Sequence, residues 1–132
     1  MLKLLALLAI GFSSLATGTA SADVTVNGSL SKWHPVTIDV TGATNSFGER
    51  LSTPNPFLDF RFDVNFTSPA GEIFTVPGFF AGDGKGNGVG DVWRARFSPG
   101  EIGQWHYEIS FHSGKDISIS DSSGIALSLI HI

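Results

Sequence analysis

Strict alternation of apolar and polar residues is the feature that most constrains this chain. Between residues 58 and 67, every even position is apolar and every odd position is polar or charged. A period of two is the repeat of a β-strand with one buried face and one solvated face, as in antiparallel sheets. The same alternation recurs at 36–41, 93–97, 105–111 and 117–120. Since no window after residue 22 has a convincing helical period, the pattern predicts an all-β protein.

Short turn signals rich in Pro, Gly, Ser and Asn separate the alternating segments. Together they predict strands near 24–30, 35–41, 58–67, 72–77, 91–97, 104–112 and 116–120. Two sheets that each have one apolar face must cover each other, so we expect a sandwich or a small barrel. Because successive side chains of a strand point to opposite faces, the parity of a position, odd or even, indicates its face. On this basis Trp93 and Trp105 point into the core together with Phe97 and Tyr107.

The first 22 residues have the pattern of a secretory signal peptide. Lys3 supplies the positive charge, residues 4–12 form an apolar run, and Ala20-Ser21-Ala22 is a cleavage site of the A-x-A type. The run is too short to span a bilayer. The alternative, a buried N-terminal helix, fits the small-residue cleavage site less well. We therefore expect a protein secreted to the periplasm, the cell surface or the medium, with no membrane attachment after cleavage.

Composition excludes several classes of function. With 12 acidic and 8 basic residues the net charge is −4, which argues against a nucleic-acid partner because such a partner requires a clustered basic face. The chain has no cysteine, which removes disulfides, thiol catalysis and cysteine-bound zinc. Its 132 residues allow one domain.

Two carboxylates on one predicted strand are candidates for acid–base chemistry. Asp59, Arg61 and Asp63 share its solvated face, where neighbours two residues apart lie about 7 Å from each other, so the two carboxylates are about 13 Å apart. An acid catalyst requires a raised pKa, whereas Arg61 lowers the pKa of both neighbours. We therefore interpret the three as a solvated charge ladder and expect no catalytic residue and no enzyme in this chain.

The glycine-rich loop at 82–91 is the one candidate for a metal site. Asp83, Asn87 and Asp91 could hold calcium loosely, but Asp, Asn and Gly are also the ordinary residues of turns. The EF-hand pattern fails because cations stand at its third and twelfth positions, and the four histidines form no ligand pattern. We expect no metal and no cofactor.

Three aromatic residues are candidates for contact with a sugar or with another domain. The parity of Trp33 is opposite to that of Val36 and Ile38, so its ring is expected outside the core. Phe79 and Phe80 are adjacent, so a continuing strand exposes one of them. Large exposed rings usually mark an interface, which favours docking over sugar binding.

Five segments in order carry a family resemblance, and they are 32–38, 55–59, 76–84, 93–99 and 103–107. They read KWHPVTI, NPFLD, VPGFFAGDG, WRARFSP and GQWHY. Across roughly residues 30–121 the chain resembles the N-terminal immunoglobulin-like domain of unknown function that precedes glycoside hydrolase barrels in secreted bacterial proteins. The resemblance implies an antiparallel immunoglobulin-like β-sandwich of about seven strands.

The resemblance also implies a function. The domain is expected to be a non-catalytic accessory domain that docks on, or orients, a downstream glycoside hydrolase barrel of the same polypeptide, and that barrel is missing here. The alternatives are a carbohydrate-binding module that holds a polysaccharide and a cell-surface spacer or adhesion module. Because the family adds a final strand after the region of Ser120, we expect a domain at 23–126 that lacks its last strand, and a non-native or truncated tail at 127–132.

Overall fold

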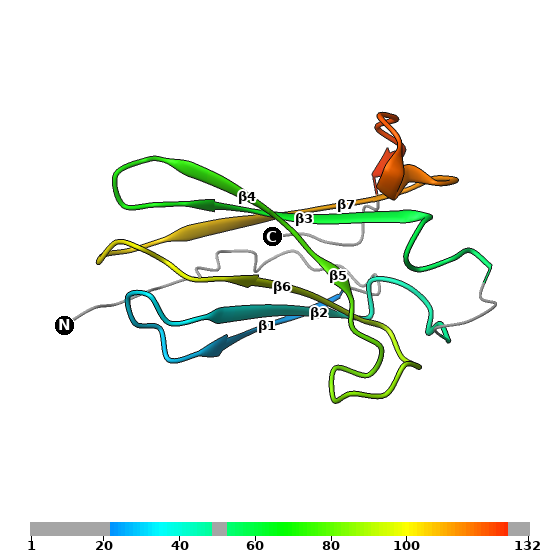
Figure 1. Ribbon diagram of the computed structural model, residues 1–132, viewed down its shortest axis with the longest axis horizontal. Helices are drawn as coiled ribbons and strands as arrows, with labels where there is room; N and C mark the ends of the chain where they lie inside the picture. Colours follow the sequence, from blue (N-terminus) through cyan, green and yellow to red (C-terminus); the bar gives the residue numbers. More distant parts are fainter. Residues whose placement is uncertain (1–21, 49–52, 127–132) are drawn as a thin grey trace, which may run out of the picture.

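The computed structural model describes residues 22–48 and 53–126, which form a two-layered all-β structure (Figure 1). The signal peptide expected at 1–22 and the tail at 127–132 therefore lie, apart from Ala22, outside the described residues. The strands are β1 (Asp23–Gly28), β2 (Val36–Thr41), β3 (Phe60–Thr67), β4 (Ile73–Pro77), β5 (Phe79–Phe80), β6 (Val92–Phe97), β7 (His106–Ser113) and β8 (Ile125–Ala126). Within this part of the chain, no helix is long and apolar enough to cross a membrane.

The strands form two four-stranded sheets with the orders β1-β2-β6-β5 and β4-β3-β7-β8. Every pairing is antiparallel. In Figure 1 the two sheets lie one above the other, with β3, β4 and β7 in one layer and β1, β2 and β6 in the other. The predicted antiparallel β-sandwich is thus confirmed, and each sheet covers the apolar face of its neighbour.

The core consists of the inward-facing residues of both sheets, and aromatic rings fill its centre. Trp93 and Trp105 are each only 2% exposed, which confirms the prediction from parity. Their indole N–H groups are satisfied, because Trp93 donates to the Thr44 hydroxyl at 3.1 Å and Trp105 to the Glu101 carbonyl at 3.0 Å. The ring of Trp93 lies 4.9 Å from that of Phe111, at an angle of 78°. Such edge-to-face contacts between the layers fix the sheets against each other.

The predicted strand at 116–120 was wrong. Residues Ile117–Ile119 form a 3-10 turn, preceded by Asp116 in the left-handed conformation with φ of 53°. The backbone N–H of Asp116 donates to the carboxylate of Asp59, which holds the chain out of an extended path. In a strand Ile117 and Ile119 would face the same side, yet Ile117 is fully buried and Ile119 is 75% exposed. The Ile-Ser-Ile sequence therefore forms a 3-10 turn, although its apolar-polar alternation is typical of a β-strand.

Strand β8 forms the edge of the second sheet beside β7. It pairs with the end of β7, where Ile125 opposes Ser113 and Ala126 opposes His112. Since the pairing is antiparallel, β8 runs toward the beginning of β7. Among residues 22–48 and 53–126, no strand pairs with β7 on this edge before His112.

Candidate functional site

Trp33 stands at one end of the sandwich, in the loop between β1 and β2. Its side chain is 68% exposed. Its backbone is in the left-handed conformation, with φ of 68°. A positive φ is unusual for a bulky residue and persists only where the surroundings impose it. Here the Trp33 N–H donates to the Pro99 carbonyl at 2.7 Å, and the next N–H, that of His34, donates to the Ser31 carbonyl at 3.0 Å. The turn therefore presents a large apolar ring to solvent in a fixed direction.

A glycine supports the ring. If Gly100 carried a Cβ atom, that atom would lie 2.9 Å from Cη2 and 3.0 Å from Cζ3 of Trp33. The indole thus rests directly on the backbone of the β6–β7 loop, and a Cβ atom at position 100 would push the ring outward. The ammonium group of Lys32 lies 5.4 Å from the ring centroid, within the range of a cation–π contact.

Other apolar residues extend this surface across the same end. Ile102 is 58% exposed in the β6–β7 loop, and Pro69 of the β3–β4 turn packs against Gly103. We call Trp33, Gly100, Ile102 and Pro69 the end surface. It joins the β1–β2, β3–β4 and β6–β7 loops, which are distant in sequence and lie together at the left of Figure 1.

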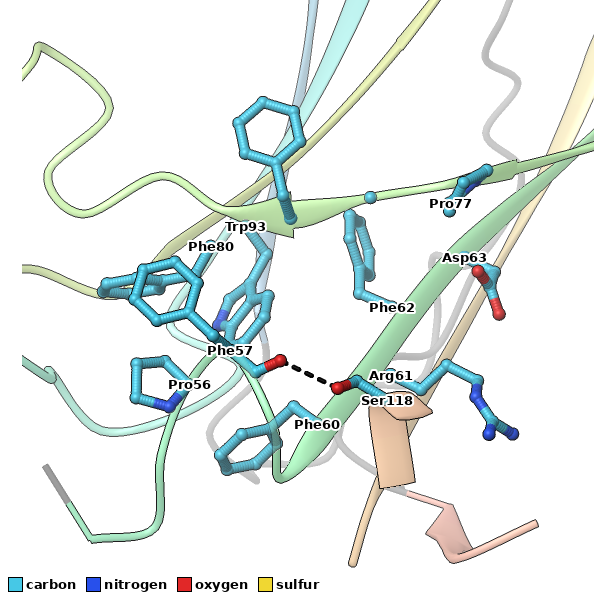
Figure 2. Close-up of a pocket in the computed structure, with 12 residues that line it drawn as sticks. Pro56, Phe57, Phe60, Arg61, Phe62, Asp63, Pro77, Phe80, Trp93 and Ser118 are labelled. Atoms are coloured by element: carbon cyan, nitrogen blue, oxygen red, sulfur yellow. Dashed lines mark hydrogen bonds between the residues drawn. The ribbon is translucent and has the colours of Figure 1, made fainter. Parts of the chain in front are cut away.

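A second exposed aromatic region lies at the edge between the two sheets, and Figure 2 shows it. Strand β4 pairs with β3 only from Asp63 onward and ends at Pro77. At Gly78, whose N–H donates to the Phe62 carbonyl at 2.6 Å, the chain crosses to the other sheet and becomes β5. The start of β3 is left uncovered, which opens a cavity of about 310 Å³ that we call the edge hollow.

Core rings form the floor of the edge hollow, namely those of Phe60, Phe62, Phe80 and Trp93. Exposed rings form its rim, because Phe57 is 48% and Phe79 is 44% exposed. Phe57 makes an edge-on contact with Phe80 at a centroid distance of 5.7 Å. The Phe79 ring lies 5.9 Å from the guanidinium of Arg96. Both rim rings are therefore held by neighbours rather than free in solvent.

Polar groups complete the rim. The guanidinium of Arg61 donates to the carbonyls of Ile117 and Ser120, both at 2.6 Å, and to that of Ser122 at 3.0 Å. The Ser118 hydroxyl donates to the Phe57 carbonyl at 2.8 Å, as the dashed line in Figure 2 shows. These bonds fix the 3-10 turn beside the hollow.

Asp63 differs from the other acidic residues near the hollow. Among the described residues, no hydrogen bond or ion pair is formed by its carboxylate. The expectation that Arg61 lowers the pKa of this carboxyl was wrong in its net direction: burial raises the pKa, and the opposing effects of Arg61 and His112 are smaller. Asp63 is thus a partly desolvated hydrogen-bond acceptor without a protein partner, on the wall of an aromatic cavity.

Asp59 has a structural role. Its carboxylate accepts hydrogen bonds from the backbone N–H groups of Asp116 at 2.9 Å and Asn55 at 2.8 Å. These bonds lower the pKa of Asp59 and tie the loop before β3 to the loop after β7. The expected charge ladder is therefore divided, because Asp59 and Arg61 bind backbone groups and Asp63 alone remains unpartnered in the described structure.

The Gly-rich loop also uses its acidic residue internally. Asp83 accepts from the N–H groups of Lys85 at 2.7 Å and Asn87 at 3.0 Å, and from the Asn87 side-chain amide at 2.6 Å. These hydrogen bonds, first that of the side chain, lower the pKa of Asp83. They are the bonds of an Asx turn. In the described ranges no three His, Asp or Glu side chains gather as a metal site requires.

The three predicted aromatic residues occupy different places. Trp33 belongs to the end surface and Phe79 to the rim of the edge hollow. Phe80 is only 6% exposed and lies in the core, so it meets the hollow only as part of its floor. One of the adjacent pair is exposed, as parity predicted. Sequence reasoning missed Phe57, which lies in an Asn-Pro turn without periodicity.

Comparison with known proteins identifies one family. Residues 29–112 match the model of the family described as Domain of unknown function (DUF5060). The matched range begins in the loop of Trp33 and ends near the end of β7, so it includes both the end surface and most of the edge hollow. No curated protein and no solved structure matches the chain.

Proposed function

We propose that this chain, which belongs to the DUF5060 family of domains of unknown function, is a non-catalytic immunoglobulin-like accessory domain of a secreted glycoside hydrolase. In this proposal it docks through its end surface on a catalytic domain that follows it in the same polypeptide. The observation that carries the proposal is the exposed Trp33 ring, fixed by a strained turn on Gly100. The resemblance of five ordered segments to domains that precede glycoside hydrolase barrels supports this partner.

The energetics favour docking at this ring. A tryptophan that is 68% exposed can lose about 150 Å² on contact, worth about 4 kcal/mol. Because the indole already lies against Gly100, part of its side-chain freedom is lost before a partner covers it. A plain spacer domain would gain nothing from a strained backbone that displays an apolar ring.

The carboxylates of the described region support a non-catalytic role. Two backbone N–H groups lower the pKa of Asp59, whereas burial raises the pKa of Asp63. A glycosidase requires a protonated acid and a second carboxylate within about 10 Å, aligned across one bond. Asp59 and Asp63 lie four residues apart on an extended segment, about 13 Å, which is too far for that pair.

The proposal requires a catalytic domain after Ala126, and the test uses a two-domain protein in which the sandwich precedes such a domain. Trp33→Ala should lower the melting temperature of the sandwich in this two-domain protein by at least about 4 °C, since a lost contact of one or more kcal/mol has that effect. The same substitution in the present chain should change its melting temperature little, because the ring is mostly exposed. Scanning calorimetry measures both.

Phe79→Ala is the matched control, because Phe79 is also an exposed ring but lies outside the end surface. It should leave the coupling between the two domains unchanged. If Trp33→Ala and Phe79→Ala have equal effects in the two-domain protein, the end surface is not the docking site and the proposed function is wrong.

A further inference from the structure

The two layers of the sandwich are unequal along the edge where β1 and β7 lie, because β8 covers only two residues of β7 there. We infer that residues 127–132 of this chain add a strand at this edge, antiparallel to β7 and in register with β8, so that their odd-numbered side chains cover the inner face of β1. The inference concerns the edge of a sheet and not the end surface, and it does not depend on the docking proposal.

The sheet orders place β1 across from the open side of β7. At the opposite edge the chain passes from β4 to β5 through Gly78, so β4 and β5 lie together there (Figure 1). Next to them β3 and β6 face each other, as shown by the stacked rings of Phe66 and Phe97 at a centroid distance of 4.5 Å. By the same order β2 faces β7, and β1 faces the position beside β7 that β8 begins to fill.

The inner side chains of β1 are covered less well than their neighbours in the same sheet. Val24 is only partly buried, whereas Val40, its partner on β2, is fully buried. The same difference separates Val26 from its partner Ile38. In the facing sheet Ile109 of β7 packs on the same core and is also only partly buried. A strand beside β7 would cover these apolar groups from the open side.

Strand β8 sets the direction and the register of such a strand. Its last residue, Ala126, lies opposite His112, and the pairing is antiparallel. Each following residue therefore falls opposite the preceding residue of β7, so that residues 127–132 fall opposite 111–106 in turn. The segment after Ala126 thus has the same number of residues as the part of β7 that lacks a partner on this side within the described structure.

The sequence of the segment has the alternation that this register requires. Opposite residues of paired strands share a face, and Phe111 shows that odd-numbered residues of β7 point inward. Leu127 and Leu129 fall on this inner face, and Ser128 between them falls on the solvated face. The expectation that this segment is non-native concerns its origin, whereas strand pairing depends only on its residue pattern.

A single strand suits this edge better than a second copy of the chain. An open edge presents N–H and C=O groups that can pair with either. If β7 of another molecule paired here, its own β2, which faces β7, would come to lie where β1 already is. One added strand brings no second layer and avoids this overlap.

Engineered cysteines test the register, because the chain contains no cysteine of its own. Ser110→Cys combined with Ser128→Cys places two thiols opposite each other on the solvated face, where paired Cα atoms lie about 4.5–5.5 Å apart and a disulfide can form. Mild oxidation of the full chain should therefore close this disulfide within one molecule. Mass spectrometry and mobility without reductant measure it, and circular dichroism establishes that each variant is folded.

Ser110→Cys combined with Leu129→Cys is the matched control. Its second thiol is one residue further along and points to the other face, so the disulfide should form at least about tenfold more slowly. The inference is overturned if the two pairs react equally, if neither pair reacts, or if the disulfide joins two molecules, because a second copy would then occupy the edge.

A readout without cysteines is the hydrogen exchange of the β7 amides that point away from β3. Leu129→Asp should speed their exchange at least about tenfold, because a charge on the inner face displaces the strand. Ser128→Asp places the same charge on the solvated face and should leave the exchange unchanged. Equal effects of the two substitutions would also overturn the inference. None of these results bears on the docking of a catalytic domain.

Discussion

Replacing Arg61 by methionine tests what holds the loop between β7 and β8 in place. Arg61 lies on β3, yet all three of its hydrogen bonds go to backbone carbonyls about sixty residues later. Those carbonyls belong to the 3-10 turn and to the residues that lead to β8. Arg61→Met keeps most of the side-chain volume and removes all three bonds, so its effect measures the hydrogen bonds rather than packing.

The expected loss follows from the exposure of the bonds. A hydrogen bond to a charged group contributes about 1.5–3 kcal/mol when it is shielded, and much less when solvent competes. The bond to Ile117 is partly buried, whereas those to Ser120 and Ser122 are exposed. Counting about 1.5 kcal/mol for the first and about 0.5 kcal/mol for each of the others, Arg61→Met should lower the free energy of unfolding by about 2.5 kcal/mol.

Urea denaturation, followed by tryptophan fluorescence, gives this free energy. The control is Arg96→Met, since Arg96 is an exposed arginine on β6 whose contact with the Phe79 ring is worth about 0.5 kcal/mol. Arg61→Lys should fall between the two variants, because an ammonium group cannot reach three carbonyls in a planar array. If Arg61→Met costs no more than Arg96→Met, the bonds to the loop do not stabilise the fold and the reasoning is refuted.

Two further predictions concern Asp59 and the crossing between the sheets. The pKa of Asp59 is lowered by backbone hydrogen bonds, the strongest from Asp116, so its ionised form stabilises the fold above the unfolded pKa of about 3.9, and this contribution disappears as the pH falls through the folded pKa. Asp59→Asn should therefore have a lower urea midpoint than the parent protein at neutral pH, and the two midpoints should converge in acid. A difference between the midpoints that stays constant with pH would contradict this. At the crossing, a Cβ atom on Gly78 would overlap the ring of Phe62. Gly78→Ala should lower the free energy of unfolding by about 1–3 kcal/mol, measured by urea denaturation. Gly114→Ala is the control and should lower it clearly less, because the nearest atom to its Cβ would lie 3.5 Å away. Equal losses in the two variants would argue against a tight crossing at Gly78.

The alternation of apolar and polar residues predicted the long strands and the core, because in these strands burial determines whether each position is apolar or polar. In β3 the alternation of eight residues matches the burial of its side chains one by one. Trp93 and Trp105 were placed in the core for the same reason. The strands β5 and β8 could not be found in this way, because two residues do not establish a period.

The candidate site was less predictable because its geometry depends on contacts between distant segments. Trp33 was recognised as exposed, but nothing in its neighbourhood reveals that Gly100 supports it. The edge hollow exists because β4 stops at Pro77 and the chain changes sheets at Gly78, which is a property of pairing and not of local pattern. The partners of Arg61 and Asp59 likewise come from a loop whose path was wrongly predicted as a strand.

The two exposed aromatic regions lie at opposite ends of β3. The end surface lies where the β1–β2, β3–β4 and β6–β7 loops meet, whereas the edge hollow opens beside β3 and β5, at the other end of β3. A catalytic domain that covers Trp33 therefore leaves Phe57, Phe79 and Asp63 accessible. Because Arg61 and Ser118 both line the hollow, the hydrogen bonds that hold the 3-10 turn against β3 also position one wall of the hollow.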